Sequence, residues 1–200
     1  MVLVYVMETV TNKTLYDLYF KSKNVFLDIF MVILSVAFLG IMANIRVPLW
    51  PVPITLQTFG VFAIAFFFGS RKGLLSILAY VLAGVVGFGV FAGYKSGMAA
   101  IMGPTGGYIL GFLITVFVVG YLIEKGYGRN KKSVLLCMVI GNLIIYLFGV
   151  IGLRLYFAEF TWLKIIMIGV VPFLIGDAIK IIGAVALFPY LWKASEKISK

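Results

Sequence analysis

Two residues of opposite charge lie in an otherwise apolar stretch near the end of the chain, within Gly176-Asp177-Ala178-Ile179-Lys180. Because they are three positions apart, a helix would place Asp177 and Lys180 on one face. Charges inside a membrane are costly and usually face a bundle interior or cavity, paired with each other or with a ligand. We expect Asp177 to accept from N–H groups of a small ligand and Lys180 to donate to its carbonyl or carboxylate. The alternative is a structural pair that neutralises itself, or a lysine that reaches the membrane surface.

Two further segments could line a site with this pair, because both contain stiff or open backbone. Residues 48–53 include three prolines, which prevent helix and fix an extended path toward Thr55 and Gln57. The segment Gly103–Tyr108 places Pro104 in the first turn of a helix, whose free N–H groups suit polar or anionic ligand groups. Either segment could instead be an ordinary turn.

Several aromatic residues gather in the same parts of the sequence, and they have two interpretations. An aromatic belt at the membrane interface explains most of them without a ligand. A few could sandwich an apolar or planar ligand instead. The residues concerned are Trp50, Tyr80, Phe91, Tyr94 and Tyr108.

The sequence argues against most other chemistry. It has no histidine and one cysteine, Cys137, so the usual general base and a disulfide within the chain are both missing. It also has no GxxxxGK[ST] motif for nucleotide phosphates. We therefore predict no catalytic residue, no metal site and no cofactor, which disfavours an intramembrane enzyme. A scaffold without transport activity would leave the burial of Asp177 and Lys180 unexplained.

The elements that must position these residues follow from composition. The chain has 200 residues, of which 63% are hydrophobic and 12% charged, and its mean hydropathy is +1.13. Soluble domains are about half apolar and about a quarter charged. The apolar runs are long and continuous, which fits transmembrane helices of about 20 residues and not the alternating strands of a barrel. The predicted fold class is all-α and integral to the membrane.

We expect six transmembrane helices in one domain, residues 25–192, between a leader at 1–24 and a basic tail at 193–200. Arg71-Lys72-Gly73 is expected to turn the chain between the second and third spans. A short apolar stretch at 162–171 ends before Pro172 and precedes the last span. The six spans are expected at about 25–43, 56–68, 74–91, 108–123, 134–153 and 173–192.

The basic residues set the orientation of these spans. With six spans, twelve Lys and Arg residues fall on the side of both termini and four on the other side, which places both termini in the cytoplasm. We expect a multi-pass protein of the plasma (inner) membrane. Its net charge of +10 is expected to interact with membrane lipid and not with nucleic acid. The four residues on the opposite side are Arg46, Lys95, Arg154 and Lys164.

Four motifs in order resemble the BioY family, the biotin-binding S components of energy-coupling factor (ECF) vitamin transporters. The resemblance runs from about residue 39 to 190. The motifs are Pro51-Val-Pro53-Ile-Thr55-Leu-Gln57, Tyr80-x3-Gly84-x2-Gly87-x2-Val90-Phe91, Gly103-Pro104-Thr105-Gly106-Gly107-Tyr108 and Gly176-Asp177-x2-Lys180.

The resemblance implies a six-helix bundle that captures biotin from outside and works with a membrane-embedded T component and ABC-type ATPases. Asp177 and Lys180 would contact the polar end of biotin, Thr55 and Gln57 would belong to a gating first loop, and Tyr108 to the site wall. Tyr80 and Phe91 are also expected to bind the substrate. An S component for another small vitamin is the alternative, and self-association is a further interaction to consider.

Three features depart from the family pattern. The family's Gly-Leu-Pro-Val-Phe is Gly87-Phe88-Gly89-Val90-Phe91 here, without the proline. Lys95 stands where a small or amide side chain is expected, and it could pair with the ligand carboxylate or be solvated. The small residues of the first span form no clean AxxxA, so they could face either the bundle or a partner helix. These are Ser35, Ala37, Gly40 and Ala43.

Overall fold

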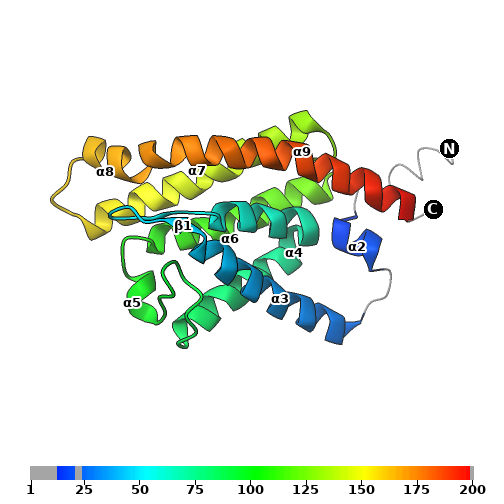
Figure 1. Ribbon diagram of the computed structural model, residues 1–200, viewed down its shortest axis with the longest axis horizontal. Coiled ribbons are helices and arrows are strands. Elements are labelled where there is room, and N and C mark those ends of the chain that lie inside the picture. Colours follow the sequence, from blue (N-terminus) through cyan, green and yellow to red (C-terminus); the bar gives the residue numbers. More distant parts are fainter. Residues whose placement is uncertain (1–12, 21–23, 199–200) are drawn as a thin grey trace.

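A computed structural model of the chain describes residues 13–20 and 24–198, with side chains up to residue 195. Of the predicted leader and tail, residues 1–12, 21–23 and 199–200 lie outside this description. The described part is a bundle of helices with one short β-hairpin (Figure 1). Strand β1 (Arg46–Val47) pairs antiparallel with β2 (Ile54–Thr55). The helices are α2 (Leu15–Tyr19), α3 (Val25–Asn44), α4 (Gln57–Val85), α5 (Met98–Ile101), α6 (Gly106–Glu124), α7 (Lys131–Tyr156), α8 (Trp162–Gly169), the 3-10 helix η1 (Val171–Phe173) and α9 (Leu174–Ile198).

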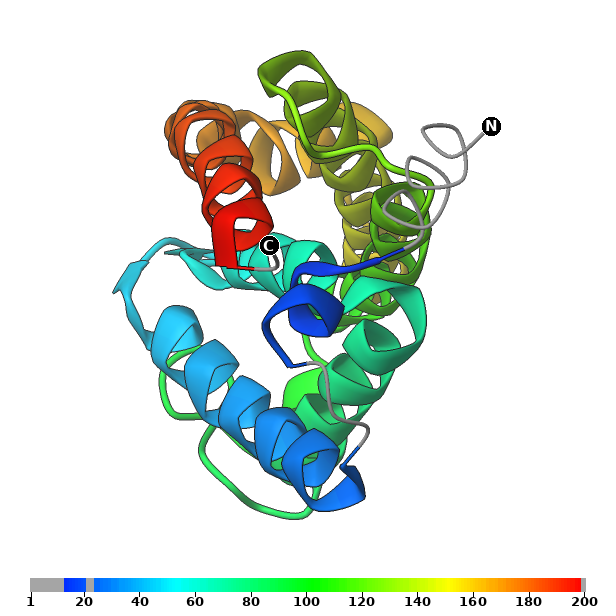
Figure 2. The ribbon, with the colours of Figure 1, turned by 90° about the vertical axis from the view of Figure 1, so that its right-hand side faces the viewer.

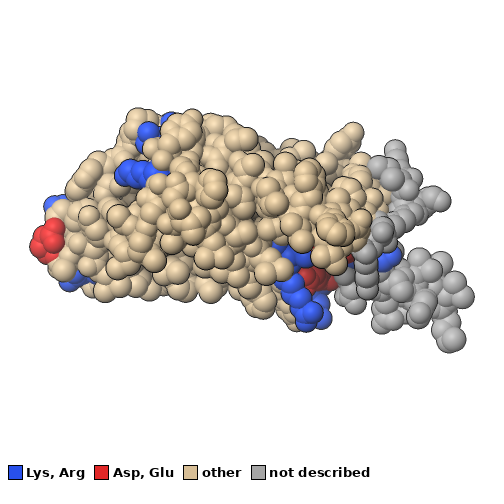
Figure 3. Space-filling view, turned by 90° about the horizontal axis from the view of Figure 1, so that it is seen from below, with Lys and Arg blue, Asp and Glu red and all other residues tan. Residues whose placement is uncertain are grey.

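Within the described part, five helical stretches are long and apolar enough to cross a membrane. Many of their large apolar side chains are exposed, as lipid-facing residues must be. Figure 3 shows one side of the molecule, with charged side chains toward its two ends and a wide area without charge between them. These properties confirm a helical, multi-pass membrane protein. The stretches are α3, α4, α6, α7 and the run from α8 into α9, Trp162–Ser195.

Helix α4 folds back on itself at Gly69. This residue has φ 74° and ψ −161°, which no α-helix contains. The Gln57 side chain donates a hydrogen bond to the Tyr80 hydroxyl at 2.7 Å. In a straight helix, 23 residues would separate these two by about 35 Å. Residues 57–68 and 70–85 therefore lie side by side, and Figure 1 shows α4 doubling back.

The observed helix ends correct three details of the sequence prediction. The chain turns at Gly69, and Arg71-Lys72-Gly73 lies within α4. The turn is made by the positive φ of Gly69 and not by the charged residues that follow it. The third span ends at Val85, so residues 86–91 belong to a loop. Helix α9 continues to Ile198, so it runs through the beginning of the predicted tail.

The connections gather at two ends of the bundle (Figure 1). The hairpin, residues 86–97, α5 and α8 lie at one end, which we call the α5 end. Helix α2 and the last turns of α9 lie at the other, the α2 end. The turn at Gly69 also belongs to this end, because a Cβ at Gly69 would lie 2.7 Å from Thr14, the N-cap of α2. Figure 2, which views the bundle end-on, shows α2 across this end beside α4 and α9, with which it makes contact.

At the α2 end, one aromatic residue connects three helices. The Tyr16 hydroxyl of α2 donates to Asp28 Oδ1 of α3 at 2.5 Å, and Lys72 Nζ of α4 donates to the same oxygen at 2.8 Å. Lys72 also lies 3.9 Å from the centre of the Tyr16 ring. Burial and the neighbouring carboxylate raise the pKa of Tyr16 to about 12, because both disfavour the phenolate.

Three of the four small residues of α3 pack against other parts of the bundle, whereas Ala37 is exposed. Ser35 and Ala43 are buried, and Gly40 lies against the Val90 side chain. The outward surface of α3 instead carries large apolar residues such as Phe30 and Ile33. Of the two roles open from sequence, the structure therefore supports close packing of most of these residues with neighbouring segments of the chain.

Candidate ligand-binding site

Asp177 and Lys180 form a buried, hydrogen-bonded cluster with residues of two other helices. Lys180 Nζ donates to Asp177 Oδ1 and to Thr58 Oγ1, both at 2.8 Å. The Tyr146 hydroxyl donates to Asp177 Oδ2. The side chains of Lys180 and Asp177 are 9% and 6% exposed. Asp177 lies in the first turn of α9, where the helix dipole also favours a negative charge.

A cavity of about 50 Å³ opens beside this cluster. Four of the predicted site residues line it, namely Thr55, Tyr108, Asp177 and Lys180. Ligand pockets usually exceed about 300 Å³, so a vitamin-sized molecule requires movement of the surrounding side chains or loops. The other lining residues are Val52, Pro53, Thr58, Phe112, Ile145, Tyr146 and Phe173.

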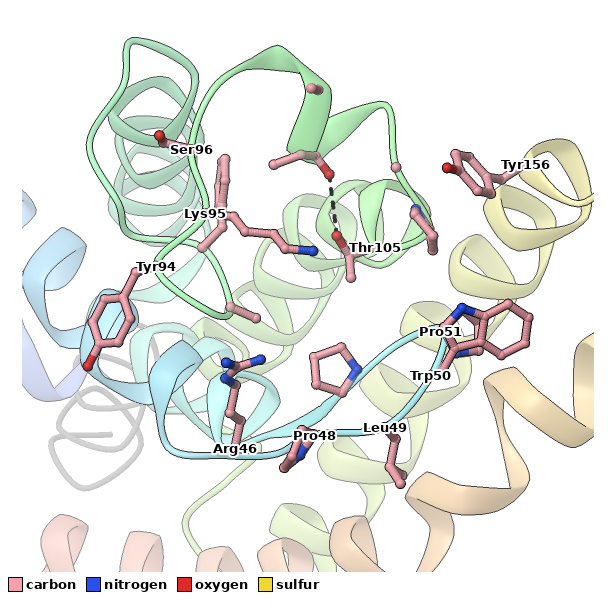
Figure 4. A pocket seen from close by; sticks show the side chains of 17 residues that line it. Arg46, Pro48, Leu49, Trp50, Pro51, Tyr94, Lys95, Ser96, Thr105 and Tyr156 are labelled. Atoms are coloured by element: carbon pink, nitrogen blue, oxygen red, sulfur yellow. Dashed lines mark hydrogen bonds between the residues drawn. The ribbon is translucent and has the colours of Figure 1, made fainter.

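A second cavity, of about 810 Å³, lies at the α5 end (Figure 4). It is bounded by the first loop (residues 45–56), the third loop (residues 86–97), α5 and the last residue of α7, Tyr156. Two cations, Arg46 and Lys95, belong to its lining, and among the described residues no Asp or Glu does. Figure 4 shows the Lys95 side chain pointing across the cavity toward Thr105. This cavity therefore suits a negatively charged group.

The two cavities adjoin at the first loop, because Pro53 lines both of them. The loop itself is attached to the connection between α7 and α8 by aromatic contacts. The Trp50 ring lies 5.5 Å from that of Phe157 and 6.5 Å from that of Phe160, between ring centres. Opening the smaller cavity through this loop would have to disturb these contacts.

Gln57 and Tyr80, which were predicted to contact a ligand, line neither of the two cavities described above. Both are buried, and the Tyr80 hydroxyl that accepts from Gln57 donates to the Val90 carbonyl at 3.0 Å. Their geometry connects the two halves of α4 to the third loop. Phe91, by contrast, lines the larger cavity, where its ring occupies the space beside Gly84.

Thr58 and Tyr146 belong to the charged cluster but were not predicted from sequence. Thr58 lies one residue beyond the first-loop motif. Tyr146 lies in the apolar part of α7, and its hydroxyl was the only sequence signal, because a phenol in a membrane needs a hydrogen-bond partner. Their contacts with α9 join residues 122 and 31 positions apart, which spacing along the sequence cannot reveal.

Comparisons with known proteins give a consistent result. A family model described as "BioY family" matches residues 12–197. The protein named "Biotin transporter BioY" of Thermotoga maritima is 43% identical over 142 residues, which are 71% of this chain and 82% of that protein. "Probable biotin transporter BioY" of Pyrococcus horikoshii is 40% identical over 160 residues, 80% of this chain and 93% of that one. A solved S-component for biotin from an ECF-type ABC transporter matches with TM-score 0.73 and 26% identity, over 83% of this chain and 90% of its own.

Proposed function

The chain belongs to the BioY family, and we propose that it captures biotin with high affinity from outside the cell and transports it across the membrane as an ECF-type S component. It is a transport protein and not an enzyme. The observation that carries this proposal is the buried Asp177–Lys180 pair beside a cavity, at the end of the bundle where four motifs of the family meet.

The proposed topology has six crossings, with both termini in the cytoplasm. Support comes from the turn at Gly69, which divides α4 into two antiparallel halves and so adds a crossing to the five apolar stretches. The beginning of α3 and the end of α9 lie at the α2 end, on the side where the basic residues are in excess. The α5 end is then the outside, and the plasma membrane is the proposed location.

The two cavities together suit the two ends of biotin. The ureido ring carries N–H donors and a carbonyl acceptor, which match the Asp177 carboxylate and the Lys180 ammonium group. The carboxylate at the other end of biotin would meet Arg46 and Lys95 in the larger cavity. Tyr108 and Phe91 would provide apolar walls for the bicyclic ring and the chain between these ends.

Binding would require rearrangement of the first loop. In the described structure Asp177 and Lys180 already bond each other, Thr58 and Tyr146, so the ureido group must replace part of this set. The small volume beside the pair points to the same step. Thr55 would move with the loop, while Gln57, at the beginning of α4, would serve as its fixed end.

Transport is proposed to depend on a T component and ABC-type ATPases, because the sequence has no nucleotide-binding motif and a solved structural relative belongs to an ECF-type transporter. Membrane lipid surrounds the bundle, self-association within the membrane is part of the proposal, and no nucleic acid is involved. Uptake of labelled biotin by cells lacking their own transporter is the test. The proposal expects rapid uptake when the chain is expressed with a T component and ATPases. Uptake no higher than in cells without the chain would contradict it.

A further inference from the structure

The last residue of α3, Asn44, attaches that helix to the third loop through its side-chain amide. Its Oδ1 accepts hydrogen bonds from the backbone N–H groups of Gly93 and Tyr94, both at 2.9 Å. Its Nδ2 donates to the carbonyls of Gly40, at 2.8 Å, and Phe91, at 3.4 Å. One side chain thus holds three backbone groups of the loop and, through Gly40, is itself fixed on α3.

The part of the loop that Asn44 holds has an unusual backbone. Gly93 and Tyr94 have φ values of 78° and 56°, and Tyr94 is the one described non-glycine residue with a positive φ. Such a conformation is disfavoured for a residue with a side chain and persists only where the surroundings enforce it. The two hydrogen bonds to Asn44 Oδ1 provide that constraint, because they fix both N–H groups on one oxygen.

Both cations of the larger cavity lie next to this attachment. Lys95 directly follows Tyr94, and Arg46 lies two residues beyond Asn44. The guanidinium of Arg46 packs against Gly93, where a Cβ would lie 3.1 Å from Nη1. Neither Arg46 nor Lys95 forms an ion pair with any other residue that the structure describes. Asn44 therefore connects the two segments that carry these cations, and no described acidic residue pairs with either cation.

We propose that Asn44 is a positioning residue that aligns Arg46 and Lys95, and that it thereby gives the site its preference for ligands ending in a carboxylate. This inference rests on the proposed biotin function. An aspartate could accept the same two hydrogen bonds, but it could not donate to Gly40 and Phe91. It would also place a negative charge beside Arg46, where it would compete with the ligand. The neutral amide is thus the side chain that suits this place.

Equilibrium binding of biotin and of biotinamide, its uncharged carboxamide, to the purified protein tests the proposal. Wild type is expected to prefer biotin by about tenfold or more, as hydrogen bonds to a charged group predict. Asn44→Ala should lower the affinity for biotin by about tenfold and change the affinity for biotinamide by less than about threefold. Combining Asn44→Ala with Lys95→Ala should reduce the affinity for biotin by less than the product of the two single losses, because both changes act on the contact made by Lys95. Equal weakening of both ligands by Asn44→Ala would overturn the proposal.

Two further variants complete the design. Asn24→Ala removes the N-cap at the opposite end of the same helix and should leave the preference for biotin unchanged. Asn44→Asp keeps the hydrogen bonds to Gly93 and Tyr94, so biotinamide should still bind, whereas the affinity for biotin should fall.

Hydrogen exchange of the third loop in the ligand-free protein tests the attachment without any ligand. Asn44→Ala should accelerate exchange at residues 93 and 94, and Asn44→Asp should not. Unchanged exchange in Asn44→Ala would overturn the attachment, and with it the proposal. If wild type bound neither ligand, the proposed function itself would be wrong, and the exchange result would still decide whether Asn44 holds the loop.

Discussion

Tyr146 of α7 and Asp177 of α9 face each other across the helix interface, and the phenol donates its hydrogen bond to the carboxylate oxygen that Lys180 does not use. Both oxygens of a buried carboxylate are thereby satisfied, which removes much of the unfavourable free energy of placing it in a membrane. The same arrangement leaves Asp177 in a fixed orientation beside the small cavity. A ligand N–H group that replaces one of these bonds would find Asp177 already oriented as an acceptor.

Tyr146→Phe is expected to weaken biotin binding by about tenfold, because Asp177 loses one hydrogen bond to a charged group. The ring and its packing remain, so the protein should still fold. Isothermal titration of the purified variant would measure the change. Tyr190→Phe is the matched control, because this tyrosine lies on α9, the helix that carries Asp177, but is exposed and lines neither cavity. Equal affinity of Tyr146→Phe and wild type would contradict the role of the phenol.

Trp50→Ala is expected to accelerate both association and dissociation of biotin, because the first loop loses its aromatic attachment. Each aromatic pair contributes about 0.5–1.5 kcal/mol, so the two contacts together predict rate changes of up to about a hundredfold. Stopped-flow fluorescence would follow both rates. Trp162→Ala, which removes a tryptophan from α8 outside these contacts, should leave the rates near wild type. Slower association in Trp50→Ala would argue against a loop that must open.

Gly69→Ala is expected to destabilise the protein by more than about 2 kcal/mol, since a side chain there combines a disfavoured φ with a steric clash. A Cβ at this position would lie 2.5 Å from Glu124 Oε1. Gly183→Ala, inside α9, would meet no atom within 4 Å and should be neutral or slightly stabilising. Thermal unfolding in detergent would compare the two. A Gly69→Ala variant as stable as wild type would contradict the described turn.

Removal of the Tyr16 hydroxyl is expected to change the alkaline stability of the protein. The pKa of Tyr16 is raised to about 12 in the folded chain, so the folded state favours the neutral phenol. Its stabilising contribution is complete below pH 10 and is lost as the pH rises toward 12, because the unfolded chain ionises first. The stability difference between wild type and Tyr16→Phe should therefore shrink between pH 10 and 12. A constant difference across that range would contradict the raised pKa.

The sequence predicts the positions of the apolar helices and the buried charged pair well, because both depend on local composition and spacing. Asp177 and Lys180 share one helix, so their proximity follows from the helical repeat alone. The turn at Gly69 was missed because Arg71 and Lys72 suggested a polar connection two residues later, whereas Lys72 instead pairs with Asp28. Charge marks where a chain approaches the membrane surface, but φ decides where it turns.

The sequence could not predict contacts between residues that lie far apart along the chain. The motifs indicate that Gln57 and Tyr80 are constrained, and the structure explains the constraint by their contact with each other. Asn44, Thr58 and Tyr146 have no motif of their own in this sequence. Their roles depend on segments brought together by folding, such as the third loop 49 and 50 residues beyond Asn44.

Binding of labelled biotin to the purified protein, compared among wild type, Asp177→Asn and Lys180→Ala, tests the central claim most directly. We expect tight, saturable binding by wild type and a loss of at least about a hundredfold in each variant, because each change leaves a buried partner unpaired. Lys193→Ala, an exposed lysine of the same helix, is the control and should bind like wild type. Absence of biotin binding by wild type, or normal binding by both variants, would contradict the account.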